Sequence, residues 1–318
     1  MAQHTARRLL TALPAAGFAL LPAACVDEPA GPLLTPPSYS TEGVQGAGAP
    51  GSIVFHSDRA GNREIYLMSP GGQDPVRLTD DAAADYYPDI SPNGRYVVFT
   101  SNRAGAKTDI YLLDLQGGST TDLTNTPAAN EDWARFSPNG QQVAFHSDRT
   151  GNYEIFVLDL RTGVLTQATS YAGVDQWAEW SPDENVLAIR RDTDVYLLEL
   201  ATGAATRLTT DPALDQMAAW SHDGKQLAFM SARAGYCSVF VMNADGSGQT
   251  NLTPKDAADA NNTWCSRAPS WTRNGEILFM SFRPAHAGNN EIYIMNADGS
   301  GLTRLTNSAG EDGGPTAR

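Results

Sequence analysis

One short turn motif recurs along the chain at a spacing that indicates a repeat architecture. Each copy starts with a large apolar residue and continues into a polar turn with Asn or Asp at its fourth place. The copies are Ile90–Gly94, Phe136–Gly140, Trp180–Glu184, Trp220–Gly224 and Trp271–Gly275. Their second residues are separated by 46, 44, 40 and 51 residues, and a period of about 40–50 residues is typical of solenoids and propellers.

The same series of short segments follows each turn. In the repeat that begins at Phe136, an apolar run (Val143–Phe145) leads to a polar hairpin tip (Ser147–Asn152) and a second apolar run (Ile155–Leu158). Other repeats add a Gly turn and a short ending such as Arg207–Thr209. β-branched and aromatic runs separated by Gly, Asn and Asp predict strands and hairpins. Four short strands per repeat predict one propeller blade.

The number of repeats predicts six blades, and the chain ends predict how the ring closes. The middle strands of the blades fall at 53–79, 97–124, 143–168, 187–209, 227–253 and 277–306. The first blade lacks an innermost strand, whereas Asp312–Ala317 matches the spacing of Asp85–Ile90. We therefore predict an all-β, six-bladed propeller of four-stranded antiparallel blades, in which the C-terminal strand completes the first blade and removes the open edges.

Composition divides the chain into three parts. Residues 1–25 have a basic start and a short apolar core, as an export signal does, and Cys25 lies in a sequence similar to a lipoprotein box. We predict lipidation at Cys25, with an ordinary cleaved secretory signal as the alternative. Residues 26–50 are rich in Pro, Gly and Ala and predict a flexible tether. Residues 51–318 form the folded head.

The charge and the motifs exclude several functions. A net charge of −14 argues against nucleic-acid binding and against binding to anionic membranes. The chain has neither a Gly-x-Ser-x-Gly nucleophile elbow nor a phosphate-binding Gly-rich loop between a strand and a helix. We expect a protein that is not an enzyme, and whose only contact with the membrane is a lipid anchor.

A column of acidic residues recurs near the start of each predicted innermost strand. Its members are Asp85, Glu131, Asp175, Asp215 and Asp312, with Ser266 in the remaining blade. Innermost strands line the channel of a propeller, so these residues predict an acidic ring at a channel mouth. The ring could bind Ca²⁺, which takes several oxygen ligands, or a basic partner group. Alternatively, each acid accepts hydrogen bonds from the backbone of a neighbouring loop. No other cofactor is expected.

A column of arginines occupies the hairpins. Arg59, Arg103, Arg149, Arg233 and Arg283 each stand two places after a Ser. Glu64, Asp109, Glu154 and Glu291 follow four of them and predict charge-assisted bonds within the hairpin. Blade five has Ser238 instead, which leaves Arg233 as a candidate surface contact, and blade four lacks the arginine.

Two cysteines of the head, Cys237 and Cys265, fall on what we expect to be the same face of adjacent blades. Outside the cytosol such thiols pair, so we predict a disulfide between them, with two unpaired thiols as the alternative. The long loop at 254–268 is a candidate binding loop. Trp264 and Arg267 flank this loop and are residue types common at binding hot spots. Alternatively, Trp264 packs under its own loop.

The repeat resembles that of TolB-type propellers, also described as PD40 or WD40-like. His56–Met68, with its Ser-x-Arg-x-Gly-x-x-Glu-Ile-Tyr pattern, fits this repeat closely. The resemblance covers about 51–318, without the α/β domain that precedes the propeller in TolB. The resemblance implies the propeller fold and an extracytoplasmic binding role. We expect an exported, periplasmic or membrane-anchored protein of the cell envelope, with a monomeric head that binds a protein or envelope component. The alternative is a carbohydrate-active or carbohydrate-binding propeller that uses the channel carboxylates.

Overall fold

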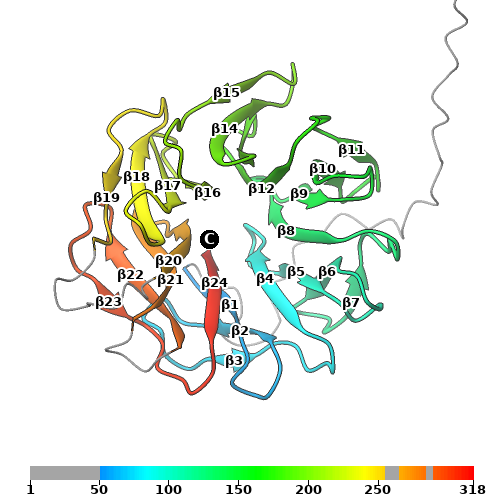
Figure 1. Cartoon of the computed structure of the whole chain (residues 1–318). Helices are drawn as coiled ribbons and strands as arrows, with labels where there is room; N and C mark the ends of the chain where they lie inside the picture. The colour runs from blue at the N-terminus through cyan, green and yellow to red at the C-terminus, as the bar shows by residue number, and fades with distance from the viewer. Residues whose placement is uncertain (1–50, 255–264, 284–288) are drawn as a thin grey trace, which may run out of the picture. The chain divides into compact units, whose positions relative to one another are not determined.

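The computed structural model describes residues 51–254, 265–283 and 289–318, and these form the predicted propeller. Six four-stranded antiparallel sheets are arranged around a central axis (Figure 1). The described residues contain only strands, turns and irregular segments, so none of them forms a helix that could cross a membrane.

Each blade has four strands at increasing distance from the axis. The innermost strands are β4 (Asp85–Ile90), β8 (Glu131–Phe136), β12 (Asp175–Trp180), β16 (Asp215–Trp220), β20 (Cys265–Trp271) and β24 (Asp312–Ala317). The second strands are β1 (Ile53–Ser57), β5 (Tyr96–Ser101), β9 (Gln142–Ser147), β13 (Val186–Arg191), β17 (Gln226–Ser231) and β21 (Glu276–Phe282). The third strands are β2 (Glu64–Met68), β6 (Asp109–Asp114), β10 (Glu154–Asp159), β14 (Asp194–Glu199), β18 (Ser238–Asn243) and β22 (Asn290–Asn296). The outer strands are β3 (Val76–Arg77), β7 (Thr120–Asp122), β11 (Leu165–Gln167), β15 (Ala205–Arg207), β19 (Thr250–Asn251) and β23 (Thr303–Arg304).

The closure predicted from the chain ends is confirmed. Strand β24 pairs antiparallel with β1, and the first blade has the order β24-β1-β2-β3. Figure 1 shows β24 alongside β1, with the C-terminal end of the chain close to the axis. The backbone N–H of Gly51 donates to the carbonyl of Arg318 at 3.1 Å, which extends the pairing beyond the strands. The first and last segments of the head therefore share one sheet.

The recurring turn is built by side-chain hydrogen bonds to its own backbone. In the second blade, the Ser91 hydroxyl donates to Asn93 Oδ1 at 2.6 Å and accepts from the N–H of Tyr96 at 2.9 Å. Gly94 has a φ of 70°, a left-handed conformation that Gly adopts without strain. Ser and Asn or Asp recur because they complete this turn.

Apolar side chains fill the spaces between neighbouring blades. One cluster packs Ile110 and Leu112 of the second blade against Phe145 and Phe156 of the third. A cluster of the same kind joins the first blade to the sixth across the closure. Each sheet is thus covered on both faces by its neighbours. The innermost strands of the six sheets surround a central channel with two ends.

Candidate functional site

The predicted acidic column lies inside the protein and is neutralised by arginine. Asp85, Glu131, Asp175, Asp215 and Asp312 are all 0 % exposed. Each forms an ion pair with an arginine of its own blade: Arg103–Asp85 at 2.5 Å, Arg149–Glu131, Arg191–Asp175 at 2.7 Å, Arg233–Asp215 at 2.6 Å and Arg59–Asp312 at 2.8 Å. These buried ion pairs each tie the innermost strand to the rest of its blade. They favour a structural role for the acids over an acidic ring that is open to the channel. The partners are mainly arginine side chains, whereas the structural alternative expected backbone donors.

The arginine partners differ from those predicted. Arg59, Arg103, Arg149 and Arg233 reach back to the innermost strand. The predicted pairing within the hairpin, with Glu64, Asp109 and Glu154, was therefore wrong for the first three. Glu64 instead accepts from the Thr79 hydroxyl at 2.6 Å and pairs with Arg77 at 2.7 Å, which holds the outer strand. Arg233 is not a freed surface contact, because it pairs with Asp215 and stacks 4.9 Å from the Phe240 ring.

Blade four also has an ion pair to its innermost-strand acid, although the column of arginines predicted none there. Arg191, at the end of β13, donates to both carboxylate oxygens of Asp175 at 2.8 and 2.7 Å. The hairpin is shorter there, so the guanidinium comes from the strand itself.

Every innermost strand contains a β-bulge, and one residue in each bulge has a positive φ. These residues are Tyr87, Trp133, Trp177, Met217, Ala268 and Gly314, with φ between 51° and 59°. The side chains of the first five belong to one cluster, although they come from five blades. Side chains from five blades can meet only at the axis, so this cluster plugs the channel. The Trp133 and Trp177 rings are edge-to-face, 4.7 Å apart.

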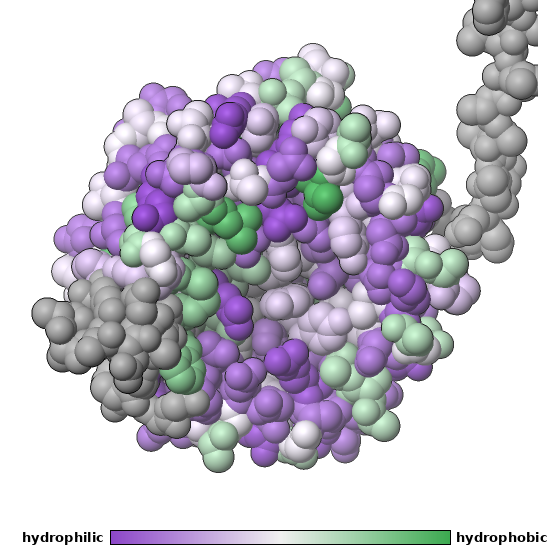
Figure 2. Space-filling view, viewed as in Figure 1, coloured by the Kyte–Doolittle hydropathy of each residue, from purple (hydrophilic) through white to green (hydrophobic). Residues whose placement is uncertain are grey.

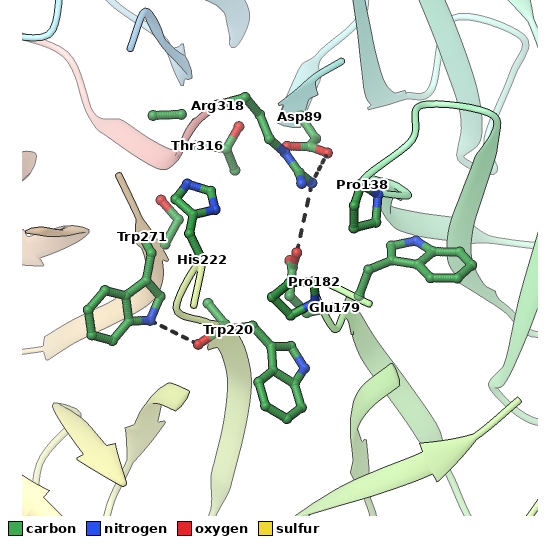
Figure 3. A pocket seen from close by; sticks show the side chains of 13 residues that line it. Asp89, Pro138, Glu179, Pro182, Trp220, His222, Trp271, Thr316 and Arg318 are labelled. Carbon is green, nitrogen blue, oxygen red and sulfur yellow. Dashed lines mark hydrogen bonds and ion pairs between the residues drawn. The ribbon is translucent and has the colours of Figure 1, made fainter. Parts of the chain in front are cut away.

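A small pocket lies on the axis where the innermost strands end, and we call it the axial pocket (Figure 3). Its volume is about 100 Å³. All six blades contribute to its lining. The lining residues are Asp89, Pro138, Glu179, Trp180, Pro182, Ala219, Trp220, His222, Ser270, Trp271, Thr316, Ala317 and Arg318.

Two arginines and two carboxylates form an ionic network at the axial pocket. Arg318 donates to Asp89 Oδ2 at 3.1 Å and lies 3.9 Å from Glu179 Oε1. Arg135 donates from Nε to Glu179 Oε2 at 3.1 Å, with its guanidinium 4.1 Å from the Trp133 ring centroid. Asp89 is 1 % exposed and also accepts from the N–H of Phe136. Figure 3 shows Arg318 between the two carboxylates.

Burial controls the charges at this pocket. Desolvation raises the pKa of Glu179 above its usual value, and Arg135 and Arg318 oppose this effect. Desolvation, together with Arg318 and Arg273, lowers the pKa of His222, so its imidazole is neutral at pH 7. Arg318 does not donate a hydrogen bond to Glu179 Oε1, because 3.9 Å is too long for one.

The predicted cysteine pair is adjacent in space but not bonded in the structure. Cys237 and Cys265 are half-buried free thiols, and their backbones form an isolated parallel β-bridge. The expectation that they lie on one face of adjacent blades is thus confirmed, whereas the disulfide stays a prediction. Arg267 lies two residues further along β20 and is half-buried, so the predicted loop bound at 268 was wrong, because the innermost strand already begins at Cys265.

Several predicted features lie outside the described residues: the signal and Cys25, the tether at 26–50, and Trp264 with most of its loop. Within residues 51–254, 265–283 and 289–318, no three His, Cys, Asp or Glu side chains come together as a metal site. Each acid of the column for which calcium binding was considered forms an ion pair with an arginine.

Sequence comparisons agree with the repeat and with the fold. A family model of the dipeptidyl peptidase IV N-terminal region matches residues 149–219. A TolB homologue of Chlorobium chlorochromatii is 28 % identical over 137 residues, which cover 43 % of this chain and 30 % of the relative. The described part of this chain is a six-bladed β-propeller whose repeat is similar to that of TolB homologues. The matched segment spans less than a third of that relative's length.

Solved structures show the same propeller fold. TolB from Acinetobacter baumannii superposes with a TM-score of 0.72 at 22 % identity, covering 84 % of this chain and 66 % of that one. An oligogalacturonate lyase in complex with manganese has a TM-score of 0.55 at 16 % identity, covering 81 % of this chain and 74 % of that one. The fold is therefore shared by proteins of different function.

Proposed function

We propose that this TolB-type propeller is an exported, non-catalytic binding protein, and that its axial pocket takes a basic side chain from a protein partner. The observation that carries this proposal is the pocket itself. It is built by all six blades, it has Pro and Trp side chains in its lining, and its polar groups include Glu179 and Arg318 (Figure 3). The similarity to TolB homologues and the signal-like residues 1–25 support export.

The charges favour a partner with Lys or Arg. Glu179 is 16 % exposed at its side chain and has one oxygen without a close donor. A guanidinium or ammonium could bind that oxygen while its aliphatic stem contacts Pro182 and the indoles. The net charge of −14 adds long-range attraction for a basic partner. Figure 2 shows a mostly hydrophilic surface, with some hydrophobic residues beside the centre of the ring and others scattered over its rim.

Two acids do face each other here, as a carbohydrate-active site would require, but the geometry argues against one. Arg318 lies between Asp89 and Glu179, and Asp89 is buried. The cavity of about 100 Å³ is well below the roughly 300–1,000 Å³ of small-molecule sites. It suits one side chain better than a sugar ring.

Site-specific photo-crosslinking in the cells that make the protein tests the proposal. The photoreactive residue replaces His222 at the pocket, Arg267 on the face that carries the thiols, or Arg161 on a turn after β10. We expect a crosslinked protein from position 222 that is lost when Glu179→Gln is added, and none from 161. Capture from 267 alone would show that the partner binds the other face and that the pocket is not the site.

A further inference from the structure

A cysteine pair occupies a junction that the fold repeats between blades. At each such junction, the residue just before a third strand accepts a backbone hydrogen bond from the next innermost strand. Asp85 donates to Arg63, Asp175 to Tyr153 and Ser266 to Cys237, at 2.8, 2.9 and 2.9 Å. Cys237 and Cys265 fill both sides of this junction between blades five and six, where other blades carry pairs such as Arg63 and Ala84.

The junction places the two thiols within bonding reach. Neighbouring strands lie about 4.7–4.9 Å apart, inside the roughly 4.4–6.8 Å that Cα atoms span in a disulfide. Both residues are half-buried, so a small reagent can reach them from solvent.

The two thiols are chemically unequal. A hydrogen bond from Cys265 lowers the pKa of Cys237, and the positive charge of Arg267 lowers it further. The same hydrogen bond and burial raise the pKa of Cys265. Thiolate character and exposure together select the attacking sulfur, and a neighbouring thiol can resolve the product.

We propose that Cys237 and Cys265 form a redox-active dithiol, with Cys237 as the attacking thiolate and Cys265 as the resolving thiol. The oxidant is a disulfide. The Cys237 thiolate attacks one of its sulfurs, forms a mixed disulfide and releases one thiolate. Cys265 then loses its proton and attacks the Cys237 sulfur, which releases the second thiolate. The protein loses two electrons and the oxidant gains them, and a Cys237–Cys265 disulfide joins blades five and six.

Glutathione disulfide is the probe, and the full chain with Cys25→Ser leaves these two as the only thiols. We expect unreduced peptide mapping to find a Cys237–Cys265 disulfide that reduced glutathione reverses. With Cys265→Ser, a glutathione adduct should accumulate on Cys237. With Cys237→Ser, adduct formation on Cys265 should be at least several-fold slower, and Arg267→Gln should slow attack by Cys237.

Three results would overturn the proposal: stable adducts in place of the disulfide in the chain with both thiols, faster reaction at Cys265, or equal rates at the two. Should Cys237→Ser not fold, as judged by circular dichroism, the adduct in Cys265→Ser and the product in the chain with both thiols still decide it. These readouts need no partner, so a failed crosslinking experiment at the axial pocket leaves them unaffected.

Discussion

The ion pair between Arg59 and Asp312 should be worth far more than an exposed pair, because it fastens the closing strand. Asp312 is 0 % exposed and Arg59 is 22 % exposed at its side chain. Arg59 Nη2 contacts both carboxylate oxygens at 2.9 and 2.8 Å, and its guanidinium lies 5.0 Å from the Tyr66 ring centroid. Arg59→Met would leave Asp312 buried without its counter-ion. Removing one partner of a buried pair costs about 3–5 kcal/mol, and the partial exposure of Arg59 places the expected loss near about 3 kcal/mol.

A double-mutant cycle measured by urea unfolding at pH 7 tests this value. Asp312→Asn should cost less than Arg59→Met, because solvent can reach the remaining arginine. The double variant should be less destabilised than the sum by about 1–2 kcal/mol, within the usual coupling of contacting residues. The same cycle on Lys225 and Asp223, which pair at 3.1 Å but are 79 % and 56 % exposed, is the control and should show no resolvable coupling. Additive losses at Arg59 and Asp312, within about 0.5 kcal/mol, would refute the reasoning.

Three further predictions concern polar groups that are buried or half-buried. Burial raises the pKa of Asp132 to about 6 in the folded protein. This value exceeds the pKa in the unfolded chain, so ionisation of Asp132 lowers the free energy of unfolding as the pH rises through 6. Asp132→Asn should therefore add about 1–3 kcal/mol at pH 7, and urea unfolding at pH 4 should show the gain gone; an equal gain at both pH values would contradict this. Burial lowers the pKa of His146 to about 3. The free energy of unfolding is therefore unaffected by this group above pH 6.5 and falls as the pH falls from 6.5 toward 3. His146→Phe should flatten the acid limb of a curve of stability against pH, and an unchanged limb would count against this reasoning. Trp271 Nε1 donates to the Ala219 carbonyl at 3.0 Å, whereas the buried Nε1 of Trp220 has no partner among the described residues. In thermal unfolding, Trp271→Phe should lower the free energy of unfolding by about 1–3 kcal/mol, and Trp220→Phe should lower it less. Equal losses of stability would argue against a role for the hydrogen bond.

The fold could be predicted because the repeat encodes it locally. Each turn needs Ser, Asn or Asp and Gly at fixed places, and the strands between turns alternate with polar tips. The match of Asp312–Ala317 to Asp85–Ile90 located the closing strand, since an innermost strand has the same requirements in every blade. The structure places both segments in the same position of their sheets.

The partners of the buried acids could not be predicted in the same way. Glu64 stands five residues after Arg59, yet Arg59 binds Asp312, which is 253 residues away. Sequence proximity favours the near acid, whereas the direction of the hairpin decides the contact. In blade four the shortened hairpin moved the arginine to position 191, outside the column being compared.

The axial pocket was missed because it depends on differences between blades. The column before the last residue of each innermost strand contains Asp89, Arg135, Glu179, Ala219, Ser270 and Thr316. A search for equivalent residues dismisses such a column as variable. Only the closed ring brings these unlike side chains together, with Arg318 reaching Asp89 across 229 residues of sequence.

The central claim is that the ring is closed by β24 in the first blade, and hydrogen–deuterium exchange of the full chain tests it most directly. Backbone amides of Asp312–Ala317 and Ile53–Ser57 pair with each other here. We predict that peptides covering Asp312–Ala317 exchange as slowly as those covering Glu131–Phe136, the innermost strand of an interior blade. Exchange of Asp312–Ala317 within seconds, while Glu131–Phe136 stays protected, would contradict the closed ring.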